Sequence, residues 1–264
     1  MLPAVDMKTA QVIQEFIRDA VKRAGVEGVV LGVSGGVDSA LTLKLCCDAV
    51  GPSNVHAVLM PENGVTKDEQ DASELIEQLG AQRHRYEIGE VVNLVREMTG
   101  FRKQRTIANI KPRVRMMLLY AIANEMHLLV AGTSNKSEFL TGYYTKYGDG
   151  ASDICPIGDL YKTQVWQLAS LVGIPEKFIE KKPTAGLWEG QTDEGELGIS
   201  YRELDEILYA MELGADAEEA ARRTGIELNQ VRRVFNMVKE TRHKRMLQPI
   251  PKIGYRTLGV DWQV

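Results

Sequence analysis

The stretch LGVSGGVDSA, residues 31–40, decides the fold that this sequence predicts. It joins a valine-rich apolar run, residues 28–34, to a helical pattern over residues 38–51. A buried strand followed by a glycine-rich turn and a helix leaves free backbone N–H groups at the start of that helix, where the helix dipole favours an anion. The turn is therefore a candidate phosphate-binding loop.

This loop differs from the Walker phosphate loop, which requires a lysine before its final serine or threonine. No lysine occurs in it, so transfer of a γ-phosphate is not the expected chemistry. Gly35 and Gly36 permit the close approach of an anion, and Ser34 and Ser39 offer hydroxyl groups. The carboxylate of Asp38 would repel a bound phosphate. We therefore expect a divalent cation between this carboxylate and the phosphates.

Helical and strand patterns alternate through the first half of the chain. The strand patterns cover residues 28–34, 54–61, 84–88 and 128–133, and the helical patterns cover residues 7–24, 38–51, 66–80, 89–98 and 103–126. This order predicts an α/β three-layer sandwich, in which a mostly parallel sheet has helices on both faces. A helical C-terminal part is predicted by the patterns over residues 200–213, 216–224 and 228–245.

Two loops that follow predicted strands are expected to meet at one edge of the sheet. They are GVSGGVDS at residues 32–39 and AGTSNKSE at residues 131–138. In parallel sheets of this kind, ligands bind beyond the carboxyl ends of the strands. Two further segments, 141–160 and 183–199, are polar and interrupted by glycines. Loops of that length within a compact domain usually serve function.

Composition excludes several classes of protein. The chain of 264 residues is 44% hydrophobic, and its net charge of −4 gives no general argument for nucleic-acid binding. Three cysteines, two of them the adjacent Cys46 and Cys47, do not form a disulfide framework. The chain start lacks the layout of a signal peptide, and no apolar run approaches the roughly 18 residues of a membrane span. We therefore expect a cytoplasmic protein that does not enter a membrane.

The hexapeptide SGGVDS, residues 34–39, resembles the signature of the N-type ATP pyrophosphatases, which break ATP between its α- and β-phosphates. Four more blocks resemble, in order, those of the NAD synthetases within that superfamily: residues 109–120, 132–165, 181–201 and 243–245. The resemblance implies a Rossmann-like, adenine nucleotide α-hydrolase-like fold. It also implies one NAD synthetase domain over residues 1–264 without a glutaminase domain, although a separate glutaminase subunit stays an open alternative.

The resemblance also implies an activity. NAD synthetases are ligases that adenylate the carboxylate of deamido-NAD (nicotinic acid adenine dinucleotide) with ATP and Mg²⁺. Ammonia then displaces AMP to form the amide of NAD, the last step of NAD biosynthesis. In this family the substrate is bound across a homodimer interface, so some residues of this chain would serve the site of a second copy.

The resemblance further assigns residues to this chemistry. Magnesium would be held by Asp38 and Glu138, and the catalytic group would include Asp38 and Lys162, to which we add Asp149 on chemical grounds. The residues expected to bind ATP are Gly32, Val33, Ser34, Gly35, Gly36, Val37, Asp38, Ser39, Thr133, Lys162 and Thr184. Those expected to bind deamido-NAD are Arg113, Lys146, Asp153, His243 and Lys244. Where relatives often carry Asp-His-Ala-Ala before the glutamate, this chain has Ser-Asn-Lys-Ser at residues 134–137.

Two of these residues have roles that their chemistry supports. A lysine is a compact charge suited to the negative charge that builds on the α-phosphate and pyrophosphate, so Lys162 would replace the lysine that the loop lacks. A buried Asp149 could hold ammonium and then take its proton, leaving neutral ammonia as the nucleophile. An ordinary turn aspartate before Gly150 is an equal alternative for Asp149.

Three other functions compete with this interpretation. A tRNA-thiolating pyrophosphatase would need catalytic cysteines, and Cys46 and Cys47 are instead expected in the core. A DNA-binding helix-turn-helix is suggested by residues 221–245, which contain eight lysines and arginines against two glutamates. The simpler explanation of this basic stretch is a cationic wall around the phosphates of the dinucleotide. An ATP-binding module without catalysis is disfavoured by the presence of both Asp38 and Glu138.

Overall fold

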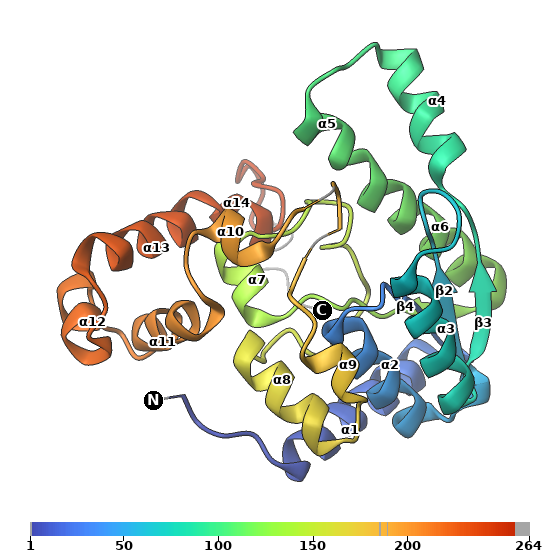
Figure 1. Ribbon diagram of the computed structural model, residues 1–264, viewed down its shortest axis with the longest axis horizontal. Coiled ribbons are helices and arrows are strands. Elements are labelled where there is room, and N and C mark those ends of the chain that lie inside the picture. The colour runs from blue at the N-terminus through green and yellow to red at the C-terminus, as the bar shows by residue number, and fades with distance from the viewer. Residues whose placement is uncertain (1, 185, 189, 257–264) are drawn as a thin grey trace.

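The computed structural model describes residues 2–184, 186–188 and 190–256. Its sheet has four parallel strands in the order β3-β2-β1-β4 (Figure 1). They are β1 (Gly28–Gly32), β2 (Val55–Leu59), β3 (Gln82–Arg85) and β4 (Leu128–Val130). The predicted parallel α/β sheet is confirmed. β1, β2 and β4 are shorter than the apolar runs that predicted them, because the last residues of each run turn into the loops at the carboxyl edge. The prediction of a strand over residues 84–88 is wrong in its bounds, because β3 begins two residues earlier and ends at Arg85.

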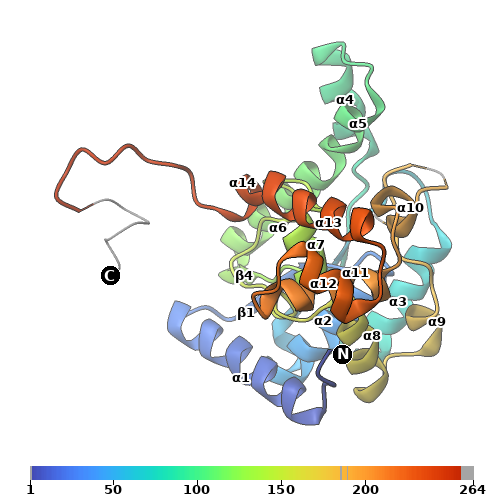
Figure 2. The same cartoon turned by 90° about the vertical axis from the view of Figure 1, so that its left-hand side faces the viewer.

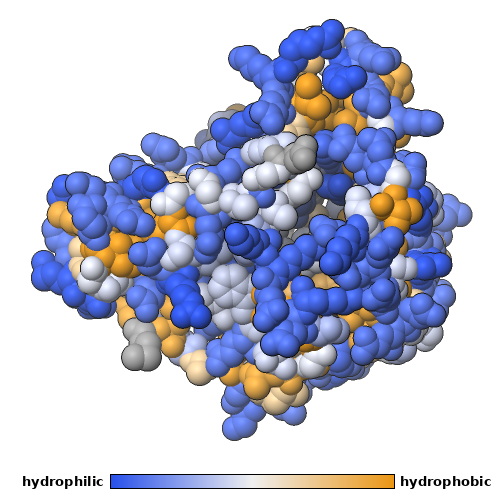
Figure 3. Space-filling model, in the orientation of Figure 1, coloured by the Kyte–Doolittle hydropathy of each residue, from blue (hydrophilic) through white to orange (hydrophobic). Residues whose placement is uncertain are grey.

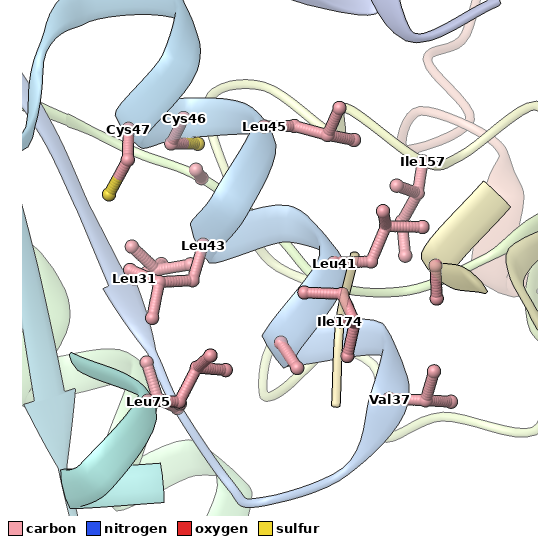
Figure 4. Close-up of a cluster of buried hydrophobic side chains, with 14 of the residues drawn as sticks. Leu31, Val37, Leu41, Leu43, Leu45, Cys46, Cys47, Leu75, Ile157 and Ile174 are labelled. Carbon is pink, nitrogen blue, oxygen red and sulfur yellow. The ribbon is translucent and has the colours of Figure 1, made fainter. Parts of the chain in front are cut away.

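Helices cover both faces of the sheet, because successive side chains of a strand point to opposite sides. Val29 and Leu31 of β1 pack with one set of helices, whereas Val30 packs with another. The first set comprises α1 (Met7–Ala24), α2 (Val37–Val50), α3 (Lys67–Leu79), α8 (Lys162–Leu171) and α9 (Glu176–Ile179). The second comprises α4 (Gly89–Thr99) and α6 (Ile110–Met126). Figure 4 shows Leu31 lying between Leu43 of α2 and Leu75 of α3.

The C-terminal part is helical, as predicted, and it has a hydrophobic cluster of its own around Tyr201, Leu204 and Val234. It comprises α11 (Tyr201–Glu212), α12 (Ala217–Thr224), α13 (Leu228–Glu240) and α14 (Arg242–Arg245). The predicted single helix over residues 228–245 is wrong, because it is interrupted at Thr241. The hydroxyl of Thr241 donates to the carbonyl of Met237 at 2.7 Å, and the side chain packs against Gly142, so the chain changes direction there.

Asn109 divides the predicted helix over residues 103–126 into α5 (Gln104–Ala108) and α6. Pro112 lies in the first turn of α6, where its missing N–H group costs no hydrogen bond. Figures 1 and 2 show α4 and α5 projecting from the rest of the molecule.

Short elements account for the remainder. A 3-10 turn, η1 (Pro52–Asn54), precedes β2, and α7 (Lys136–Thr141) follows β4. Within the predicted loop 183–199 lies α10 (Asp193–Leu197), capped by the hydroxyl of Thr192. Ala185 and Glu189 of that loop lie outside the described residues. Throughout the part of the chain that is described, none of the helices is both long and apolar enough to cross a membrane.

Candidate active site

A cavity of about 960 Å³ lies beyond the carboxyl ends of the strands. In Figure 3 a hollow opens in the face shown, rimmed mostly by hydrophilic residues. The cavity is lined by the loop before α2, the end of β2, α6, and segments around residues 132–149, 181–191 and 243–244. The two loops expected at one sheet edge, GVSGGVDS and AGTSNKSE, thus face the same space.

The glycine-rich loop has a backbone shape that requires glycine at position 35. Gly35 has φ +82°, and a Cβ atom there would lie 2.4 Å from the carbonyl oxygen of Asp68. The hydroxyl of Ser39 donates to the carbonyl of Gly36 at 3.0 Å and so holds the turn closed. Gly36, the residue before α2, provides no side-chain cap, which leaves the first N–H groups of α2 for another acceptor.

Three charged side chains from distant parts of the sequence meet at this loop. The ammonium group of Lys162 donates a hydrogen bond to Oδ2 of Asp38, and it lies 3.8 Å from Oε1 of Glu138. The Lys162 side chain is 3% exposed, and the two carboxylates are 17% and 16% exposed. Lys162 is the first residue of α8, Asp38 lies in the first turn of α2, and Glu138 lies in the first turn of α7. The N-termini of three helices therefore meet at this cluster.

The charges of this cluster depend on each other. Burial alone would lower the pKa of Lys162, but the negative charges of Asp38 and Glu138 outweigh burial and raise it. Burial and the neighbouring Asp38 raise the pKa of Glu138 well above its ordinary value, despite the opposing effect of Lys162. The ammonium group of Lys162 therefore lies between two carboxylates, and each charge of this cluster shifts the pKa values of its neighbours.

Asn135 is a residue of this cluster that the sequence analysis missed. Its Nδ2 donates to Oδ1 of Asp38 at 2.9 Å, and its Oδ1 accepts from the N–H of Glu138 at 3.0 Å. The carboxylate of Glu138 accepts in turn from the N–H of Asn135, which completes a capping box. The pattern Asn-x-x-Glu is a recognised sequence signal for such a box and could have identified Asn135.

The remaining residues expected to bind ATP are also at the cavity. Gly32, Val33, Ser34, Gly36, Val37, Ser39, Thr133 and Thr184 line it, whereas Gly35 shapes the loop from behind. Thr184 Oγ1 accepts from the N–H of Gly186 at 3.1 Å. The structure thus gathers these residues around one space, although they come from separate segments of the chain.

Asp149 lies in the cavity wall and closes a turn at the same time. Its Oδ1 accepts from the N–H of Thr145 at 3.0 Å, four residues earlier, and so holds the turn between the two residues. Burial raises its pKa, although the hydrogen bonds from Thr145 act in the opposite direction. Both interpretations of this residue therefore agree with the geometry.

Four of the five residues expected to bind deamido-NAD line the cavity together: Arg113, Lys146, His243 and Lys244. Lys146 Nζ donates to the carbonyl of His243 at 2.9 Å. Arg113 Nη2 donates to the carbonyl of Lys146 at 3.3 Å. Lys244 Nζ donates to the carbonyls of Gly142 and Tyr144 at 2.6 and 2.7 Å. These cations are thus held by neutral carbonyl groups, which leave their positive charge available to an anionic ligand.

Asp153 is the exception, because it does not line the cavity. It is exposed, its Oδ2 accepts from the N–H of Val130 at 2.8 Å, and its Oδ1 accepts from the hydroxyl of Tyr120 at 3.2 Å. It therefore lies beside the end of β4, apart from Arg113, Lys146, His243 and Lys244. Nothing in the sequence around Asp153 indicated this separation.

Several other charged residues at the cavity were not predicted, among them Asp193, Arg115 and Lys181. Asp193 is buried, and its Oδ1 has no hydrogen-bond partner among the described residues. Burial raises its pKa, while Lys162 acts to lower it. Arg115 donates from Nε to the carbonyl of Met60 at 3.2 Å. Lys181 donates to the carbonyl of Gly35 at 3.0 Å and pairs with Asp68 at 2.6 Å.

The basic C-terminal stretch is mostly engaged within the molecule. Arg223 and Arg232 pair with Glu219 and Glu218, and Arg233 donates to the carbonyl of Leu197. The guanidinium of Arg245 donates to the carbonyls of Phe139, Leu140 and Val238. Of this stretch, only His243 and Lys244 line the cavity.

The cysteines do not form a thiolate site. Cys46 and Cys47 are buried in α2, as expected. Burial raises the pKa of Cys46, and it raises the pKa of Cys47 and of Cys155 to about 12. A catalytic thiol needs a lowered pKa, so this geometry gives no support to a thiolating enzyme.

A parallel α/β sheet with a glycine-rich loop and a buried lysine–carboxylate cluster at its carboxyl edge defines an anion-binding α/β enzyme. The NAD synthase family model matches residues 9–248. An NH₃-dependent NAD⁺ synthetase of Archaeoglobus fulgidus is 49% identical over 248 residues, 93% of this chain and 97% of that protein. The chain therefore belongs to the NAD synthase family and is an enzyme of the ligase class.

Solved structures agree with this placement. The NH₃-dependent NAD synthetase of Campylobacter jejuni, in complex with nitrate, has a TM-score of 0.82 and 33% identity, over 94% of this chain and 100% of that one. A structure described as NMN synthetase, from Francisella tularensis, has a TM-score of 0.83 and 33% identity, over 94% and 98%. Proteins that share this fold are thus named for different products.

Proposed function

We propose that this protein uses ATP and Mg²⁺ to amidate deamido-NAD with ammonia, forming NAD, AMP and pyrophosphate through an adenylated carboxylate. The observation that carries the proposal is the position of Lys162, buried between Asp38 and Glu138 in a cavity that Arg113, Lys146 and Lys244 also line. The names of the curated relatives support ammonia as the nitrogen donor.

Asp38 and Glu138 are the proposed magnesium ligands. Both carboxylates reach the same ammonium group, and among the described residues no group of three or more histidines, cysteines or carboxylates is placed to hold a metal. Two hard oxygen donors with room for phosphate oxygens and water suit Mg²⁺. The ion, when bound, would neutralise charge on the phosphates of ATP.

The chain's own groups would then direct the first step. The free N–H groups at the start of α2 bind the pyrophosphate that leaves, and Lys162 supplies positive charge where the α-phosphate reacts. Gly32, Val33, Thr133 and Thr184 enclose the rest of the nucleotide. The substrate carboxylate attacks the α-phosphorus atom, the bond to the bridging oxygen breaks, and pyrophosphate leaves.

In the second step, ammonia attacks the activated carbonyl carbon and AMP leaves with the bonding electron pair. Asp149 is the proposed acceptor of the proton that ammonium must lose. Its carboxylate is buried at the cavity wall, and this burial raises its pKa. Exclusion of water from this space would protect the adenylate from hydrolysis.

Arg113, Lys146, His243 and Lys244 are the proposed contacts of deamido-NAD, whose diphosphate requires positive charge. Asp153 keeps its proposed role only if the substrate extends beyond the cavity of one chain. Its outward position suits a site shared between two copies, so we propose a homodimer. We further propose that residues 1–264 act as one synthetase domain, in the cytoplasm.

Product analysis tests this function. Purified protein with ATP, Mg²⁺ and deamido-NAD is supplied with either ammonium or glutamine, and the products are separated by chromatography. We expect NAD, AMP and pyrophosphate with ammonium and none of them with glutamine. Release of ADP and phosphate would contradict the proposal, and equal activity with glutamine would contradict the assigned nitrogen donor.

The mononucleotide is the alternative substrate to include, because one structural relative is described as an NMN synthetase. Nicotinic acid mononucleotide and deamido-NAD are compared by kcat/KM in the same assay. We expect the dinucleotide to be preferred, since curated relatives at 45–49% identity are named NAD⁺ synthetases. A higher kcat/KM for the mononucleotide would reassign the substrate but not the chemistry.

A further inference from the structure

A fully buried carboxylate lies behind the candidate active site and outside the cavity lining. Asp205 of α11 has no exposed surface. Its Oδ1 accepts from the hydroxyl of Ser137 at 2.5 Å. Its Oδ2 accepts from both the N–H and the hydroxyl of Thr163, each at 2.8 Å. The C-terminal helical part therefore reaches toward the site through this side chain.

The partners of Asp205 are the chain neighbours of two active-site residues. Ser137 precedes Glu138 in α7, and Thr163 follows Lys162 in α8. The hydroxyl of Ser137 also accepts from the N–H of Lys162 at 2.9 Å. Asp205, Ser137 and Thr163 thus form a continuous hydrogen-bonded connection between the first turns of α7 and α8.

This connection matters because the first turns of α7 and α8 are not held in place by the hydrogen bonds of the sheet. The helix α7 has only six residues, and α8 follows the long segment 142–161. A buried carboxylate is costly unless donors surround it, and here three donors do. An apolar side chain at position 205 would join the cluster of Leu204 and Leu208, but it would leave the donors of Ser137 and Thr163 unpaired.

We infer that Asp205 is a positioning residue, which holds Glu138 at its distance from Lys162 and Asp38 by fastening α7 to α8. This inference rests on the proposed function, because the spacing matters only if these residues hold magnesium and the phosphates of ATP. Outer groups that orient the residues around a bound ion commonly change affinity or activity by about 10- to 100-fold when removed.

The test is Asp205→Asn, which keeps the size of the side chain but turns an NH₂ group toward one of the donors. The matched control is Glu206→Gln, the next residue of the same helix, which removes one negative charge without touching the donors of Ser137 and Thr163. Both variants and the unaltered protein are assayed for kcat, for half-saturating Mg²⁺ at fixed ATP, and for thermal unfolding. Measurements are made well below the unfolding temperature of each variant.

We expect Asp205→Asn to raise half-saturating Mg²⁺ or to lower kcat by about tenfold or more, while Glu206→Gln changes neither. A lowered unfolding temperature with unchanged kcat and Mg²⁺ dependence would overturn the inference, because it would show a structural role only. If Asp205→Asn does not fold, Ser137→Ala, which removes the shared hydroxyl, takes its place. Its kcat and half-saturating Mg²⁺ are then compared with those of the unaltered protein.

The failure of this inference is distinguishable from failure of the proposed function. An unaltered protein that makes no NAD refutes the function, whatever the variants do. An active unaltered protein whose Asp205→Asn and Ser137→Ala variants keep full activity and Mg²⁺ dependence refutes only the positioning role.

Discussion

Lys162 at the start of α8 donates a hydrogen bond to Asp38 of the phosphate loop, across 124 positions of sequence. The loop lacks a lysine of its own, and the fold supplies one from another helix. Because the lysine approaches beside Asp38 rather than from within the loop, its charge lies between the loop and Glu138. This arrangement suits cleavage next to the α-phosphate and differs from that of a Walker loop.

Replacing Lys162 by methionine should lower the rate of AMP formation in a single turnover by about 100- to 1,000-fold, because the charge on the reacting phosphate loses its partner. Lys162→Arg should not restore the rate, since the planar guanidinium does not fit where a buried ammonium lies. Lys44→Met is the control, as Lys44 pairs with Asp48 near the far end of α2. Wild-type rates for Lys162→Met would remove its proposed role.

Asp38→Asn and Glu138→Gln should each abolish adenylation, because both carboxylates are proposed to hold magnesium. Adenylate or AMP formation is measured over a range of Mg²⁺ concentrations. Asp48→Asn, at the other end of α2, should behave as the unaltered protein. Normal adenylation in either active-site variant, at ordinary Mg²⁺, would exclude that residue as a ligand.

Gly35 and Gly214 allow the cost of an unfavourable backbone angle to be measured separately from the cost of a steric clash. Gly35 and Gly214 have φ +82° and +84°, but only Gly35 of this pair has a neighbour within reach of a new Cβ atom. Gly214→Ala should destabilise the fold by about 1 kcal/mol, the usual cost of that conformation. Gly35→Ala should lower the free energy of unfolding by more than Gly214→Ala does, and it should also weaken ATP binding. Urea unfolding and calorimetry measure the two effects, and equal results for both variants would contradict the described loop shape.

The titration of Asp205 predicts how stability depends on pH. Burial raises its pKa from 3.8 to about 6, against the effect of its hydrogen-bond donors. Between these values the folded protein binds more protons than the unfolded chain, so the contribution of Asp205 to stability is complete below the lower value. It is lost as the pH rises through about 6.

Asparagine at position 205 does not titrate, so the comparison isolates this group. From pH 4 to pH 7 the free energy of unfolding of the unaltered protein should fall by about 2 kcal/mol relative to Asp205→Asn, because a difference of one between the two pKa values corresponds to about 1.4 kcal/mol and pH 4 already lies above the lower value. Urea unfolding of both proteins at several pH values measures it. A difference that stays constant with pH would show that Asp205 has an ordinary pKa.

Local patterns were sufficient to predict the sheet and the phosphate loop. The strand, the turn at Gly35 and Gly36, and the helix after them are neighbours in sequence, so periodicity and glycine content identify them. The meeting of Asp38 with Glu138 followed from parallel topology, because carboxyl ends of adjacent strands share an edge. The chemistry of individual residues was predicted through the family resemblance and not through periodicity.

Tertiary contacts account for what the sequence did not reveal. Thr241 interrupts a helical pattern because it packs against Gly142, about a hundred residues away. Asp153 turns from the cavity because its carboxylate accepts from the N–H of Val130. The buried Asp205 looks in sequence like any acidic residue of an amphipathic helix, and only the fold shows its donors.

The exchange of labelled pyrophosphate into ATP, without ammonia, tests the central claim most directly. It isolates adenylation from the amide-forming step, and it requires only the protein, ATP, Mg²⁺, deamido-NAD and the label. We predict that label enters ATP when deamido-NAD is present and not when it is omitted. If active protein produces no exchange under these conditions, or releases ADP instead, the proposed cleavage between the α- and β-phosphates is contradicted.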